Sequence, residues 1–99
     1  MAVGSLTVSD SSGAAYTGRG LLHSVLIGGT DGTNDITVTI YDNIVASGIV
    51  LVPTHVVDAS ALGMNGVSLN VGKNFDIGVY VEITTSGTVD VTCDIEARA

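Results

Sequence analysis

The sequence has few of the residues that stabilise small domains by cross-linking. One of its 99 residues is a cysteine, Cys93, so an internal disulfide is excluded. Cys93, His23 and His55 are too few and too scattered for a structural zinc site, which takes four ligands. A chain of this length, the size of one small domain, therefore depends on its core and on contacts with other molecules for stability.

Charged residues are also scarce. They make up 13% of the sequence, against about 25% in typical soluble domains. Hydrophobic residues make up 45%, and so few charges can scarcely cover a free surface. A short, apolar chain usually hides part of its surface against copies of itself or a larger body, so we expect obligate assembly.

Positively charged residues are scarcer than negatively charged ones. Three Lys and Arg residues stand against ten Asp and Glu, which gives a formal net charge of -7. Such a chain repels phosphate backbones and anionic lipid, so we expect neither a nucleic-acid nor a membrane partner. Residues 1–6 lack the basic and apolar segments of a signal peptide, and no apolar run approaches the ~20 residues of a membrane span.

What the sequence does contain is a rhythm of short β-branched runs separated by Gly, Ser, Asn and Asp. This rhythm, with one proline and no long helical periodicity, predicts an all-β, single-domain antiparallel β-sandwich or barrel. The segment 58–63 could form one helical turn. The expected strands are 6–9, one near Ala15, 21–27, 36–41, 48–52, 67–71, 77–84 and 89–96.

The last two expected strands alternate clearly between apolar and polar residues. A three-residue loop over residues 85–87 would pair Ile83 with Val89, and the same register would pair Ile77 with Ile95 at the other end of the two strands. On the opposite face, Glu82 would then lie across from Asp90. We expect these two carboxylates to be solvated, although a cation or basic partner could also bind them.

The segment 21–27 is apolar on both faces, so we expect both to be covered, one by the core and one by a neighbouring subunit or a crossing loop. The predicted interface consists of residues of this segment together with the two arginines of the chain. These are Leu21, Leu22, His23, Val25, Leu26, Arg19 and Arg98.

No set of residues predicts catalysis, so we expect no enzyme activity and no cofactor. His23 and Ser24 are adjacent on a strand and point to opposite faces, so they cannot act as a base and nucleophile pair. Cys93 is expected to be a buried apolar residue. Asp31 and Asp35 are weak calcium candidates, but the segment between them is more typical of a tight turn.

Four segments resemble small virion proteins of tailed bacteriophages. They are residues 20–27, 36–42, 46–50 and 76–81, and the resemblance extends over about residues 19 to 96. It implies a jelly-roll-like subunit of the capsid cement, decoration or head auxiliary type. It also implies a homotrimer, binding to the major capsid protein, and a place on the capsid surface of the virion after synthesis in the host cytoplasm.

Together these observations predict a structural virion protein that stabilises the phage head shell as a homo-oligomer. Residues 1–14 are expected to be a flexible N-terminal arm or first strand, and residues 15–99 a β-sandwich domain. Two alternatives stay open, a phage tail or spike component and a carbohydrate-binding β-sandwich module. Sugar sites need aromatic platforms, and Tyr80 beside Glu82 is the candidate here.

Overall fold

The computed structural model describes residues 2–9, 11–28, 36–57, 67–84 and 89–98. In these segments the chain forms eight β-strands and no helix, which confirms the predicted all-β class. Each predicted strand has a counterpart. The strands are β1 (Ala2–Ser9), β2 (Gly13–Thr17), β3 (Gly20–Gly28), β4 (Ile36–Asp42), β5 (Ile49–Val57), β6 (Val67–Phe75), β7 (Gly78–Thr84) and β8 (Asp90–Ala97).

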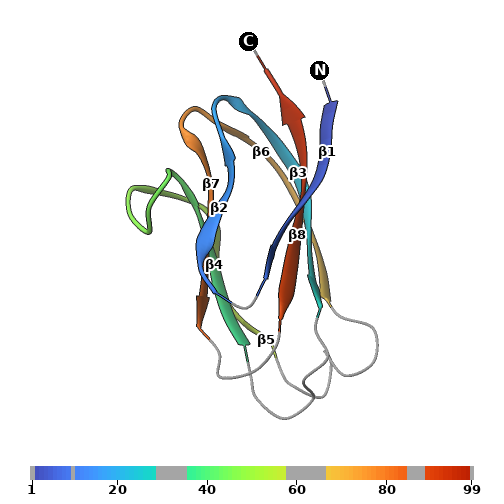
Figure 1. The fold of residues 1–99 in the computed structure, drawn as a ribbon, viewed down its shortest axis with the longest axis vertical. Helices are drawn as coiled ribbons and strands as arrows, with labels where there is room; N and C mark the ends of the chain where they lie inside the picture. Colours follow the sequence, from blue (N-terminus) through green and yellow to red (C-terminus); the bar gives the residue numbers. More distant parts are fainter. Residues whose placement is uncertain (1, 10, 29–35, 58–66, 85–88, 99) are drawn as a thin grey trace.

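The strands form two antiparallel four-stranded sheets that pack face to face (Figure 1). The first sheet has the order β1-β8-β3-β6 and the second has the order β2-β7-β4-β5. The chain changes sheet at every connection except the one between β4 and β5. This confirms the antiparallel sandwich, and the strand order is that of an eight-stranded jelly roll.

The core lies between the two sheets and is built by the inward side of each strand. Val79 and Val81 of β7 and Val91 and Cys93 of β8 are completely buried there. The burial of Cys93 confirms its predicted role as an apolar core residue, and burial raises the pKa of its thiol to about 12. A thiol with so high a pKa is a poor nucleophile at neutral pH.

The predicted pairing of the last two strands is wrong. β7 pairs with β2 and β4, whereas β8 pairs with β1 and β3, so the two strands lie in different sheets. Glu82 therefore lies opposite Thr39, and Asp90 opposite Ser9 and Gly28, instead of facing each other. The alternation of residues gave the inward side of each strand correctly, but it carries no information about the neighbouring strand.

One residue of the predicted alternation also lies elsewhere. Ile77, expected on the inward side, precedes β7 and is 50% exposed. The N–H group of Ile77 donates a hydrogen bond to the carboxylate of Asp42, at 2.8 Å. The predicted loop 85–87 and the predicted helical turn 58–63 lie outside the described residues.

β5 and β6 are both longer than predicted. β5 continues through Pro53, which an edge strand tolerates because one side of its backbone has no strand partner to donate to. β6 continues through Gly72, which has a φ of 64° and lies where the pairing with β3 shifts register. A bulge of this kind lets a strand continue with a local bend.

Asp42 ties the end of β4 to the turn between β6 and β7. Its side chain is buried, with 6% of the residue exposed, and one carboxylate oxygen accepts the N–H groups of Ile77 at 2.8 Å and Gly78 at 3.3 Å. Both of its oxygens also lie 3.1 Å from the N–H group of Asp76. This turn carries the chain from one sheet to the other, so Asp42 fixes how the sheets are joined.

The first residues of the chain are part of both sheets. Residues 2–9 form β1, which pairs with β8. Just before β2, the hydroxyl of Ser12 accepts the N–H group of Ile83 at 2.8 Å and lies 3.3 Å from the carbonyl oxygen of the same residue. Within residues 1–14, the described parts are thus β1 and the start of β2.

Candidate functional site

Two of the predicted interface residues on β3 point into the core. The register of β3 shifts between Leu22 and Ser24, and as a result Leu22 and Val25 both point towards the opposite sheet. Both are 0% exposed, so neither is available to a partner, and their assignment to an interface is corrected. Leu21 is half-buried, and Leu26, at 48% exposure, lies on the outer face.

His23 is exposed on the same outer face and pairs with Glu96 of β8. The His23 Nε2 and Glu96 Oε1 atoms are 3.1 Å apart. This hydrogen bond, opposed by partial desolvation and aided by the nearby charge of Arg98, lowers the pKa of the Glu96 carboxyl. In the single chain the outer face of β3 is open at His23, and its expected cover by a neighbouring subunit stays a prediction.

A larger apolar surface lies on the other sheet. Five exposed aliphatic side chains belong to β5 and to the turn between β4 and β5, which stands out from the sandwich (Figure 1). Successive strand residues face opposite sides, so they cover the edge of the sheet from both sides. Ile49 is 70% exposed and Val56 is 67% exposed. We call this set of residues the β5 surface. Its members are Ile44, Val45, Ile49, Val50 and Val56.

The β5 surface carries no charge of its own. Residues 43–57 contain no Asp, Glu, Lys or Arg, in a chain whose net charge is -7. The acidic residues in the strands of this sheet are Asp42, which is buried and accepts backbone N–H groups, and Glu82, which lies two strands away on β7 and accepts the hydroxyl of Tyr41 at 3.3 Å. A second copy of this acidic chain can therefore approach here with the least electrostatic repulsion.

The edge of β5 is poorly suited to pairing with another strand. Pro53 lacks the N–H group that a new strand would need, and the pairing of β4 with β5 shifts register twice, around Ile40. Prolines and bulges are common devices against edge-to-edge pairing. The edge is thus protected while the side chains on its face are exposed, so contact by side-chain packing is favoured over extension of the sheet.

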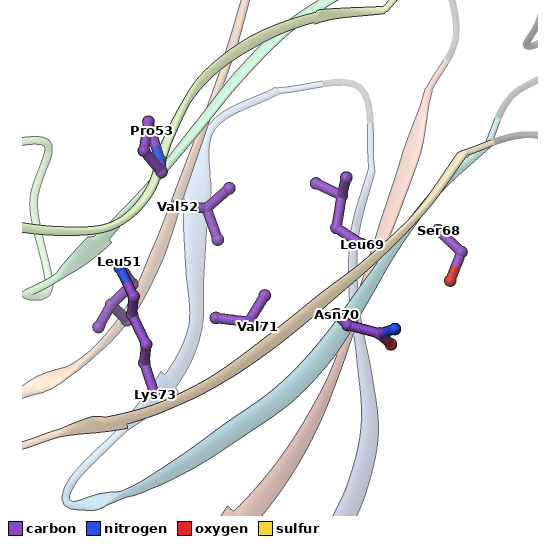
Figure 2. A pocket seen from close by; sticks show the side chains of 8 residues that line it. All are labelled: Leu51, Val52, Pro53, Ser68, Leu69, Asn70, Val71 and Lys73. Atoms are coloured by element: carbon purple, nitrogen blue, oxygen red, sulfur yellow. The ribbon is translucent and has the colours of Figure 1, made fainter.

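A cleft of about 290 Å³ opens between the edge strands β5 and β6. Figure 2 shows the side chains of Val52 and Val71 pointing into it from opposite sheets, whereas Ser68 and Asn70 point away. Lys73 also lines the cleft. Because Val52 is 4% exposed, this part of the wall belongs to the core and offers a partner little area.

Two tyrosines lie side by side on the outer face of the second sheet. Tyr41 of β4 is the register partner of Tyr80 of β7, and both are half-buried. Partial desolvation, the charge of Glu82 and the hydrogen bond to it raise the pKa of the Tyr41 hydroxyl. Sequence reasoning identified Tyr80 and Glu82 but missed Tyr41, because only the pairing of β4 with β7 brings them together.

The remaining predicted site residues fall into two groups. Arg19 and Arg98, far apart in the sequence, line one pocket. The calcium candidates Asp31 and Asp35 lie outside the described residues. Among the side chains that the structure does describe, no group of three or more His, Cys, Asp or Glu is placed to hold a metal ion. The described residues also include no helix capable of crossing a membrane.

Comparisons with protein-family models, curated proteins and solved structures gave no match for this chain.

Proposed function

We propose that this chain is a structural virion subunit, a capsid cement or decoration protein that binds the phage head shell as a homo-oligomer, with a trimer as the expected state. The observation that carries the proposal is the β5 surface, an exposed, uncharged group of aliphatic side chains on an otherwise acidic, charge-poor domain. Monomeric proteins rarely leave such surfaces uncovered.

The size of the chain supports the same proposal. Its accessible surface is 5043 Å², and a specific protein interface takes about 800 Å² from each partner, roughly a sixth of that area. Burying the five side chains of the β5 surface contributes roughly 1 kcal/mol each per copy, because they are about half exposed. Association itself costs about 4–15 kcal/mol, which burial of this surface on two copies can offset, and contacts with the shell add to it.

Attachment to a shell supplies those contacts by multivalency. When several linked copies each contact the shell weakly, the later contacts form at a high effective concentration. Separation of the capsid subunits then requires several contacts to break together. In this role the jelly roll is a rigid spacer, and the chemistry is entirely that of its surfaces.

The test is co-sedimentation of the purified chain with purified heads and, separately, purified tails of the phage that encodes it. We expect saturable binding to heads at a fixed copy number. Val56→Asp should reduce binding because a charge in the β5 surface separates the copies and removes their multivalent contact with the shell. Leu26→Asp is the matched control on the other sheet. Binding to tails alone would favour the tail or spike alternative, and binding to neither would contradict a structural virion role.

A second candidate function is carbohydrate binding, favoured by the pairing of Tyr41 with Tyr80 beside Glu82. Aromatic faces pack on sugar rings while carboxylates accept hydrogen bonds from sugar hydroxyls. Titration of the isotope-labelled chain with defined oligosaccharides tests it. Saturable shifts at Tyr41 and Tyr80 that disappear in Tyr80→Ala are expected for a sugar site, and no shift for any sugar would contradict it.

A further inference from the structure

A second pocket lies at the end of the sandwich where β1 begins and β8 ends (Figure 1). Its volume is about 390 Å³. Three parts of the chain build it, namely the turn between β2 and β3, the end of β6, and the residue after β8. The lining residues are Arg19, Gly20, Asn74, Phe75, Asp76 and Arg98.

The backbone holds the two arginines next to each other. The N–H group of Arg98 donates to the carbonyl oxygen of Arg19 at 3.0 Å. Beside them, Gly20 packs so closely that a Cβ atom would lie 2.5 Å from the carbonyl oxygen of Glu96. The pocket also includes the ring of Phe75, which is 2% exposed and makes an edge-to-face contact with Tyr16 at 5.9 Å. The frame of the pocket is therefore fixed.

The lining concentrates positive side chains in an acidic protein, because it holds two of the three Lys and Arg residues of the chain. Asp76 in the lining and Glu96 beside Arg98 bring the formal charge of the cluster to 0. Arg19 Nε lies 3.5 Å from Asp76 Oδ1, and Arg98 Nη2 lies 3.5 Å from Glu96 Oε2. Both ion pairs are exposed and long, so they hold the guanidinium groups weakly. Each contact involves one of the five N–H donors of its arginine.

We propose that this pocket binds a carboxylate side chain presented by a protein partner. Two guanidinium groups can donate to both oxygens of one carboxylate, and Asn74 adds an amide donor. Asp76 and Glu96 offset the two arginine charges, so the formal charge of the cluster gives a dianion such as phosphate no advantage over a monoanion. The proposal is independent of whether the partner is a phage shell.

The direct test is an NMR titration of the isotope-labelled chain with N-acetylglutamate amide. We expect saturable shifts at the side chains of Arg19, Arg98 and Asn74, with a Kd on the order of 10 mM for so small a ligand. N-acetylglutamine amide, which has the same shape and no charge, should give no saturable shift. Arg19→Gln and Arg98→Gln should each raise the Kd about tenfold, since each removes a charge-assisted contact.

Lys73→Gln is the matched control, because it removes the same charge from the cleft on the other side of β6. It should change the Kd less than about twofold. Three results would overturn the proposal: no saturable shift, equal effects of Lys73→Gln and the arginine variants, or tighter binding of inorganic phosphate.

A variant that combines Arg19→Gln with Arg98→Gln identifies the molecule that supplies the carboxylate. Loss of the oligomer assigns it to a second copy, and loss of shell binding alone assigns it to the shell.

Discussion

The two sheets share one core, yet their outer faces have opposite character. The outer side of the first sheet carries three acidic residues along β8, with Ser and Thr side chains of β1 on one side and His23 and Leu26 of β3 on the other. The second sheet carries Tyr41 and Tyr80 on its outer side and the β5 surface at its edge. The first face is therefore the more acidic of the two. The core thus accounts for the fold, and the contrast between the outer faces accounts for the proposed function.

The largest expected effect compares the two sides of one strand. Leu22→Ala should destabilise the fold by about 2–5 kcal/mol, because Leu22 is completely buried and its loss leaves a cavity. Leu26→Ala, on the outer side of the same strand and 48% exposed, should cost less than about 1 kcal/mol. Chemical denaturation measures both. Equal losses would show that the outer face of the first sheet is also covered.

The next effect concerns the connection between the sheets. Asp42→Ala should destabilise the fold by about 2–3 kcal/mol, because it leaves the N–H groups of Asp76, Ile77 and Gly78 without the carboxylate that accepts them. Amide hydrogen exchange of Ile77 and Gly78 should increase in this variant. Unchanged stability and exchange would mean that the turn between β6 and β7 is held by other contacts.

The smallest effect tests the acidic face of the first sheet. The pKa of Glu96 is lowered from 4.5, chiefly by the hydrogen bond with His23, so folding favours the ionised carboxylate. Its contribution to stability is present above about pH 4.5 and is lost as the pH falls through the lowered pKa. His23→Ala should raise the pKa of Glu96, measured by NMR titration of its carboxyl carbon. An unchanged pKa would assign the shift to Arg98.

Much of this fold was predictable from the sequence, because the strands alternate in period two and turn residues separate them. All eight strands and the inward sides of β7 and β8 follow from that pattern. The pairing of strands did not follow, because alternation reports which side faces the core and not which strand is adjacent. The alternation pattern also does not predict the shift of register that buries both Leu22 and Val25.

The candidate surfaces were less predictable. The sequence does carry one signal for the β5 surface, the absence of charge from 43 to 57, but the expected strand ends at Val52, before Pro53. The approach of Arg19 to Arg98 depends on the turn between β2 and β3 meeting the end of β8, which only the complete topology determines. Local pattern thus predicts elements, whereas sites built from distant segments require the fold.

The central claim, that the β5 surface joins copies of this chain, is tested most directly by the solution mass of the purified protein. Light scattering after size exclusion should give a multiple of 10.0 kDa, with three copies as the expected number, and little dependence on salt. Ile49→Asp with Val56→Asp should reduce the mass to that of one chain, while Leu26→Asp should leave it unchanged. A monomeric wild type, or a double variant that still assembles, would contradict the account.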